Sequence, residues 1–308
     1  MVALIGGTTA AFTLTEALKL QRSPIGKPRI RPFFSPACEC PTSTARMRIR
    51  LKEEDRLDVV VVDSDGEPVR TLASDVRESP GKLTFTWDGR TDAGTLAPDG
   101  TYRLRVHLDE ERRTIVVPNA TRIDTQPPTA ELVSLAPRVL SPDGDGRRDS
   151  TTLVVSLDER SRPIVLVDGT PAEEGRRAPA GESELAWPGT RDGRPLRKGT
   201  YVVGVQARDR AGNVSPPSSG LTVRVRYVLL GRKTYRPRRA GTLRFRVSTD
   251  AARFAWRLSR GGKVVMRGRE KPPTVSVRLP ERVERGRYKL KVVANGHRAD
   301  AAVIVGPR

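Results

Sequence analysis

The chain has 308 residues, 36% of them hydrophobic, and 27 Gly and 25 Pro exclude a largely helical protein. The regular patterning of Val, Leu and Thr excludes a disordered one. The formal net charge is +20, but residues 227–308 alone hold 22 basic and 5 acidic side chains, so most of the excess charge belongs to the last third of the chain.

The first segment, residues 1–20, is mostly apolar but is interrupted by Glu16 and Lys19. It falls short of the roughly 20 continuous apolar residues of a membrane span. It also lacks the basic flank and cleavage site of a secretory signal. We predict a short hydrophobic helix, the remainder of a signal-anchor that begins upstream of Met1; an ordinary helix packed on the first domain is the alternative. Residues 21–32, rich in Pro and basic side chains, are predicted to be an extended linker.

A first β-domain is predicted over residues 33–123. Met47, Ile49 and Leu51 alternate with basic residues, which is the period of a half-buried strand. A more apolar strand follows at 57–62 and ends in a Gly-containing hairpin turn. Further strands are expected at 68–72, 82–87, 102–108 and 113–117.

Residues 124–129, which include two consecutive prolines, are predicted to be a linker. A second domain over 130–226 then repeats the order of elements, with strands expected at 132–135, 152–157, 164–167, 184–187 and 201–208. In each domain a strand ends on a Trp, a turn follows, and a Gly-Thr-Tyr opens the next strand. Trp87 and Trp187 lie 100 residues apart, about the length of one β-sandwich. We predict both Trp rings in the core rather than as carbohydrate-stacking platforms, and both Tyr hydroxyls on nearby backbone groups.

Residues 227–308 lack the Trp-turn-Tyr signature but still alternate in the manner of strands, for example at Leu243, Phe245 and Val247. Gly286-Arg-Tyr288 keeps the Gly and the Tyr of the Gly-Thr-Tyr motif. We predict a diverged third sandwich. The expected fold class is therefore all-β, a series of tandem immunoglobulin-like or fibronectin-III-like β-sandwiches preceded by a short N-terminal hydrophobic helix.

Three acidic residues, Asp143, Asp145 and Asp149, lie in a Gly-rich loop. Calcium prefers several carboxylate and carbonyl oxygens on such a loop, but the bidentate Glu of an EF-hand does not follow, and Asp-Gly pairs are also common in turns. We predict a structural turn, with Ca²⁺ the one cofactor the sequence suggests. Cys38 and Cys40 occupy the equivalent loop of the first domain, and a local disulfide is predicted there.

The basic third domain is the best candidate for a partner surface, because a face rich in Arg attracts polyanions. The arginines alternate with core positions, so many of them are expected to share one solvent face. The predicted polyanion-binding residues are Arg236, Arg238, Arg239, Arg244, Arg246, Arg253 and Arg257. A simply solvated Arg-rich face is the alternative.

The segment Trp87-Asp-Gly-Arg-Thr-Asp-Ala-Gly, continued by Pro98-Asp-Gly-Thr-Tyr102, resembles the immunoglobulin-like domain of the flagellar hook-capping protein FlgD. The resemblance covers residues 33–117 well, and in residues 130–208 the motif is only partly kept. Ser141-Pro-Asp-Gly-Asp-Gly and Asp209-Arg-Ala-Gly-Asn-Val-Ser215 are similar to segments of other bacterial surface modules. The resemblance implies an Ig-like fold and export. It does not imply a hook cap, because the helical N-terminal part of one is missing.

We find no Ser/His/Asp set, paired catalytic carboxylates or phosphate-binding loop, so we predict a non-enzyme. The favoured function is an exported bacterial surface protein, anchored in the cytoplasmic membrane by its N-terminus. Its sandwiches would form a structural or adhesive stalk, and its basic domain would contact an anionic cell-wall polymer or another surface protein. The alternatives are a nucleic-acid-binding protein acting through 227–308, which export disfavours, and a carbohydrate-binding accessory module. The sequence does not predict an oligomeric state.

Overall fold

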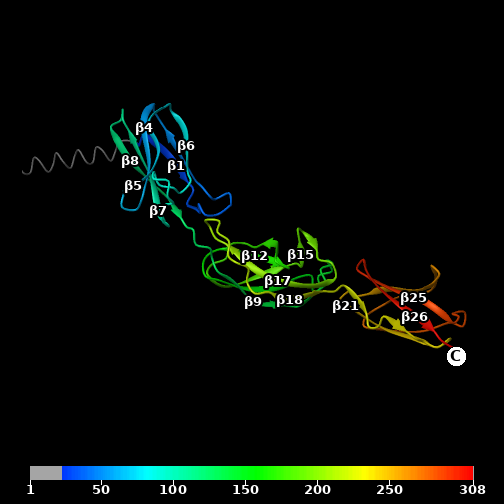
Figure 1. Ribbon diagram of the computed structural model, residues 1–308. Coiled ribbons are helices and arrows are strands. Elements are labelled where there is room, and N and C mark those ends of the chain that lie inside the picture. The colour runs from blue at the N-terminus through cyan, green and yellow to red at the C-terminus, as the bar shows by residue number, and fades with distance from the viewer. Residues whose placement is uncertain (1–22, 308) are drawn as a thin grey trace, which may run out of the picture. The chain divides into compact units, whose positions relative to one another are not determined.

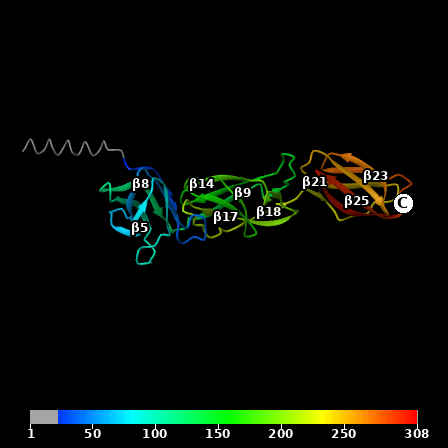
Figure 2. The ribbon, with the colours of Figure 1, turned by 90° about the horizontal axis from the view of Figure 1, so that it is seen from above.

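A computed structural model describes residues 23–307, and this part of the chain consists of 26 strands without a helix. Of these residues, 23–126 together with Arg210–Asn213 form one compact unit, and 127–209 together with 214–307 form a second. The strands group into three sandwiches, coloured blue to cyan, green, and yellow to red along the chain (Figures 1 and 2). The predicted helix over 1–20 lies outside the described residues. Within 23–307, no helix is long and apolar enough to cross a membrane.

The first sandwich packs a three-stranded sheet, in the order β1-β3-β6, against a five-stranded sheet, in the order β2-β8-β7-β4-β5. Its core is built by alternation: Met47, Ile49 and Leu51 are buried while the basic residues between them are exposed. The strands are β1 (Ile25–Ile30), β2 (Phe33–Phe34), β3 (Ala45–Leu51), β4 (Asp55–Val62), β5 (Pro68–Glu78), β6 (Gly81–Trp87), β7 (Gly100–Leu108) and β8 (Arg113–Ile123).

The prediction of a linker over 21–32 is wrong for the segment Ile25–Ile30, which pairs with β3 as an antiparallel strand. Its proline does not prevent this, because β1 is an edge strand and the register shifts between Gly26 and Arg29, so Pro28 falls in a bulge. Ile25 joins the core, which fixes the strand to the sandwich.

The second sandwich repeats this arrangement with the sheets β14-β11-β9 and β10-β18-β17-β12-β13, and β15 and β16 form a small hairpin beside them. Its strands are β9 (Ala130–Ala136), β10 (Val139–Leu140), β11 (Thr151–Leu157), β12 (Arg162–Val167), β13 (Thr170–Glu174), β14 (Gly181–Trp187), β15 (Thr190–Arg191), β16 (Arg194–Pro195), β17 (Gly199–Arg208) and β18 (Leu221–Val225).

The third sandwich has the same two-sheet plan, with the sheets β19-β21-β24 and β20-β26-β25-β22-β23. In all three sandwiches a two-residue strand runs parallel to the last strand of the five-stranded sheet: β2 with β8, β10 with β18, and β20 with β26. The strands are β19 (Val228–Leu230), β20 (Thr234–Tyr235), β21 (Thr242–Thr249), β22 (Phe254–Arg260), β23 (Lys263–Glu270), β24 (Thr274–Arg278), β25 (Gly286–Ala294) and β26 (His297–Val305).

Candidate functional site

The Trp-turn-Tyr segments have a structural role in the core of the sandwiches. Trp87 is 1% exposed and lies edge-on to Tyr102, with 4.9 Å between ring centroids. Its Nε1–H donates to the Arg90 carbonyl at 2.8 Å, and the Tyr102 hydroxyl donates to the Pro98 carbonyl at 2.6 Å. The prediction that these rings belong to the core is confirmed, and a buried ring offers no stacking platform to a sugar.

Both bonds recur in the second sandwich, and the Tyr bond alone recurs in the third. Trp187 is fully buried and donates to the Thr190 carbonyl, while the Tyr201 hydroxyl donates to the Arg197 carbonyl at 2.8 Å. In the third sandwich, which has lost the Trp, the Tyr288 hydroxyl still donates at 3.0 Å to the carbonyl four residues earlier, that of Glu284. The hydrogen bond of the Tyr hydroxyl is therefore kept in a sandwich that lacks the rest of the Trp-turn-Tyr signature.

The two cysteines and Asn213, all singled out in the sequence, lie in the first unit. Cys38 and Cys40 are joined by a disulfide bond. Asn213, of the Asp-x-x-Gly-Asn-x-Ser segment, donates from Nδ2 to the Asp124 carbonyl at 2.8 Å and to the Gln126 carbonyl at 3.2 Å. An amide that satisfies two carbonyls of a Pro-containing segment stabilises that segment, so the motif has a structural role here.

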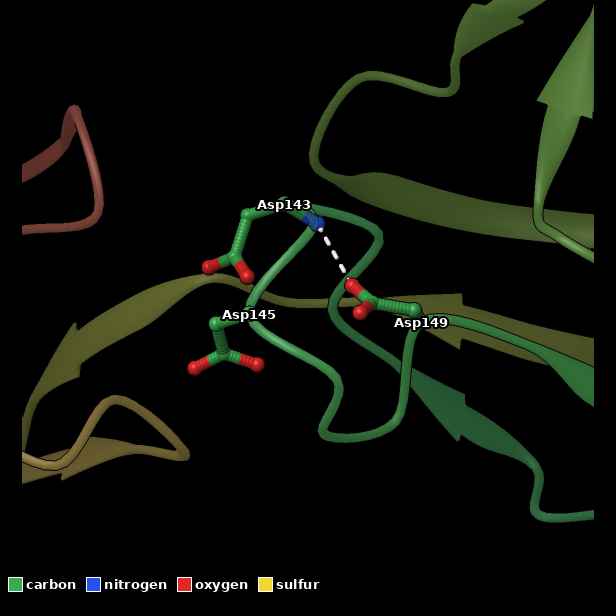
Figure 3. A group of neighbouring side chains, drawn as sticks. All are labelled: Asp143, Asp145 and Asp149. Carbon is green, nitrogen blue, oxygen red and sulfur yellow. Dashed lines mark hydrogen bonds between the residues drawn. The ribbon is translucent and has the colours of Figure 1, made fainter.

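The acidic loop brings Asp143, Asp145 and Asp149 together, with carboxylate oxygens within 4.8 Å of one another (Figure 3). The Asp149 carboxylate accepts backbone N–H bonds from Asp143, Gly144 and Gly146, at 3.0, 2.8 and 2.6 Å. These bonds are those of a structural turn, as predicted. Calcium binding stays a prediction.

Two residues distant in sequence complete this cluster within the second unit. Asn295 donates from Nδ2 to Asp143 at 3.2 Å and to Asp145 at 2.9 Å. Asp250 has both carboxylate oxygens buried, and neither has a hydrogen-bond partner of good geometry. Burial raises the pKa of the Asp250 carboxyl, and the Ser141 hydroxyl offsets part of this rise. Asp143 and Asp145 repel the charged form and raise the pKa further.

We expect Asp250→Asn to stabilise the second unit at pH 7 by about 1 kcal/mol, because it removes a buried charge without a partner. The folded-state pKa lies above the ordinary value of 3.8. The stability linked to Asp250 is therefore fully present below pH 3.8 and is lost as the pH rises through the folded-state pKa. Urea unfolding of the full chain at both ends of this range should show the gain at pH 7 and its absence at the acid end.

The matched control is Glu270→Gln, an exposed position of the third sandwich with the same change in charge. An equal gain in both variants would mean that net charge, and not the burial of Asp250, limits stability.

The same urea titration repeated with added Ca²⁺ tests the prediction of a calcium site at Asp143, Asp145 and Asp149, since an ion bound by the folded state raises the unfolding midpoint.

The predicted polyanion-binding arginines are all exposed but do not share one face. Arg244 and Arg246 lie on β21 of the three-stranded sheet, whereas Arg257 lies on β22 of the five-stranded sheet. The expectation of a common solvent face is wrong, because alternation shows which residues leave a strand outward but not which sheet the strand joins. The remaining four follow β20 or precede β22: Arg236, Arg238, Arg239 and Arg253.

The five-stranded sheet of the third sandwich gathers cations that we did not predict as binding residues, notably Lys291 on β25 and Arg298 on β26. In the sequence, Tyr288, Leu290 and Val292 alternate with basic residues. This alternation predicts that Lys291 lies on the outward side of a strand, but it does not predict that Lys291 lies beside Arg257.

Comparison with known proteins bears on the first sandwich. The family model "FlgD Ig-like domain" matches residues 41–111. A stretch of 66 residues of the chain is 36% identical to the basal-body rod modification protein FlgD of Salmonella typhimurium. The first sandwich is a FlgD-type Ig-like domain. The match covers 21% of this chain and 28% of the Salmonella FlgD, so it concerns this domain and not the whole flagellar protein.

Solved structures similar to the chain include the fibronectin(III)-like modules of Clostridium thermocellum CbhA, with 18% identity, a TM-score of 0.35, and 65% and 94% of the two chains covered. FlgD from P. aeruginosa has 19% identity, a TM-score of 0.24, and 44% and 89% coverage. At these scores the likenesses carry no further argument. The FlgD-type domain and the repeated Ig-like plan support a structural, non-catalytic domain protein.

Proposed function

We propose that this is an exported bacterial surface protein in which tandem Ig-like sandwiches form a spacer and the basic third sandwich contacts an anionic polymer. A membrane anchor at the N-terminus is part of this proposal and rests on the apolar composition of residues 1–20. Export is supported by the FlgD-type domain of the first sandwich, since FlgD proteins belong to the flagellum.

The observation that carries the polymer contact is the charge of the third sandwich. Residues 227–308 hold 22 basic and 5 acidic side chains. Among the described residues of this sandwich, Arg260 pairs with Glu284 at 3.5 Å and Lys289 with Asp300 at 3.0 Å. Most of its cations are therefore exposed to solvent, where they attract a polyanion by releasing its counterions.

A nucleic acid is the less suitable polyanion for this sandwich. Binding of single strands uses exposed aromatic rings on which bases stack. Every Phe, Trp and Tyr in the described part of the third sandwich is buried. A polymer whose charge is not accompanied by bases suits this surface better.

The test is to titrate the full chain with poly(glycerol phosphate) and with neutral dextran over a range of salt concentrations. We expect binding of the phosphate polymer that weakens steeply with salt, and none of dextran. Absence of binding at low salt would refute the polymer contact. Recovery of the native protein in the cytosolic fraction of its own cells would refute export and anchoring.

A further inference from the structure

The charged side chains on the outward face of the sheet β20-β26-β25-β22-β23 are almost all basic. Its outward positions follow from alternation, since the residues between them, such as Trp256 and Leu290, are buried. They include one acidic residue, Asp300, and seven basic ones, which together we name the basic face: Arg257, Arg267, Arg269, Arg287, Lys289, Lys291 and Arg298.

The strand register places like charges directly opposite each other. Arg257 pairs in register with Arg267 on β23 and with Lys291 on β25. Neighbouring strands lie about 4.8 Å apart, so three cations stand in one row across three strands. Like charges in opposite positions destabilise a sheet. Such a row costs stability unless an anion lies against it.

No residue of the described chain supplies that anion. Asp300 pairs with Lys289 at 3.0 Å. Within residues 23–307, the side chains of Arg257, Arg267 and Lys291 form no ion pair or hydrogen bond, and the same holds for Arg269. On β21 of the opposite sheet, by contrast, the Arg244 Nε–H donates to the Ser276 hydroxyl at 3.3 Å.

The row borders a hollow of about 690 Å³. Its floor is apolar and low, because Ala255 and Val293 are short side chains that pair in register on β22 and β25. Cations stand around this floor: Arg257, Arg267, Arg269 and Lys291.

Trp256, which also borders this hollow, directs its side chain to the core face of the sheet, where it packs on Phe245. Trp256 is 5% exposed, and its Nε1–H has no hydrogen-bond partner. The indole reaches this position because its neighbour in register is Gly268, where a Cβ would lie 2.7 Å from Nε1. The indole is therefore part of the sandwich core, and the hollow above it is formed by the side chains of the outward positions.

We propose that this hollow, which we call the phosphate groove, binds phosphodiester groups of a linear polymer. The planar guanidinium forks of its arginines match phosphate oxygens in bidentate geometry. The Ala255 and Val293 floor suits the short carbon links between successive phosphates. This inference rests on the proposed polyanion contact and assigns it to one site.

The decisive comparison pairs two variants of the full chain with equal loss of charge. Arg257→Gln combined with Arg267→Gln removes two cations of the phosphate groove. Arg244→Gln combined with Arg246→Gln removes two from the other sheet of the same sandwich. With poly(glycerol phosphate), we expect the groove variant to bind about 10- to 100-fold more weakly, and its salt dependence to flatten by about one to two in log–log slope. The control should lose less than about threefold.

A third variant tests the shape of the groove without a change in charge. Ala255→Leu fills the floor of the hollow, and the position is partly exposed, so the fold should tolerate it. We expect about tenfold weaker binding, since the chain of the polymer can no longer lie on the floor. Circular dichroism and a cooperative unfolding transition establish that each variant is folded.

The outcomes separate the two proposals. If both double variants lose affinity equally, or Ala255→Leu has no effect, attraction is diffuse and the groove is refuted while the polymer contact stands. If the unmodified chain binds no polyanion, the proposed function falls first. Equal affinity for polygalacturonate would refute the preference for phosphate, and tighter binding of oligothymidylate with the same number of phosphates would indicate a nucleic-acid site instead.

Discussion

Replacing Trp87 with alanine is expected to destabilise the first sandwich by about 3–5 kcal/mol, the range measured for large aromatic truncations in cores. The ring is 1% exposed, packs 5.4 Å from Phe34 and 4.9 Å from Tyr102, and donates a hydrogen bond to the Arg90 carbonyl. The variant therefore loses buried area, two aromatic contacts and one satisfied donor. Small domains have a free energy of unfolding of about 5–15 kcal/mol in total. The first sandwich of the variant should therefore unfold at a lower denaturant concentration than that of the unmodified chain.

Hydrogen exchange of the full chain, followed by mass spectrometry on peptides from β3 and β7, reports this sandwich separately from the others. Val116→Ala is the matched control, because that side chain is 49% exposed in the same sandwich and should cost under about 0.5 kcal/mol. If Trp87→Ala cost no more than Val116→Ala, the ring would not be the centre of the core.

Local patterns were sufficient for the strands and for most of the core. The alternation that predicted a strand at Met47 to Leu51 reflects a property of each strand alone, its two faces, and the buried side chains followed it. The tyrosine bond could also be predicted, because the Tyr102 hydroxyl binds a carbonyl four residues away in the sequence. The same holds for Tyr288, where Gly286-Arg-Tyr288 was the remaining trace of the motif.

The sites depend on pairings that no local pattern encodes. Asn295 donates to Asp143 although 152 positions of sequence separate them, and Asp250 is also distant in sequence from both residues. Three of the predicted arginines, Arg244, Arg246 and Arg257, could be placed at outward positions of strands, but their strands, β21 and β22, belong to opposite sheets of one sandwich. Arg257 acquires its neighbours, Arg267 and Lys291, through the strand register, which a single sequence does not give.

Composition also misled us at one place. Pro28 and the basic residues around it suggested a linker, since proline cannot donate to a sheet ladder. An edge strand, however, needs to donate on one side only, and Ile25 and Ile30 supply the contacts that hold it. A short strand with few apolar residues is predictable only when its partner, here β3, is known.

Gly89→Ala should cost the first sandwich about 2–5 kcal/mol, the second largest effect we expect, from two causes that can be separated. Gly89 has a φ of +80°, where a Cβ alone costs about 1–2 kcal/mol. A Cβ at this position would also lie 2.9 Å from the Pro36 side chain and 3.3 Å from the Phe34 ring, and crowding of this kind typically adds about 1–3 kcal/mol. The Pro36 ring is attached to the backbone of a loop, so it cannot turn aside as a long side chain would.

Gly94 lies in the same turn and separates the two causes. Its φ is +82°, nearly that of Gly89, but a Cβ there would meet nothing within 4 Å. Gly94→Ala should therefore show the backbone cost alone, and the difference between the variants in the exchange of β6 amides measures the contact with Pro36 and Phe34. Equal costs would mean that the Trp-Asp-Gly turn needs its glycine for backbone conformation only. A larger cost at Gly89 would mean that the glycine also lets the turn close over the core, which explains why the motif places it two residues after the buried Trp87.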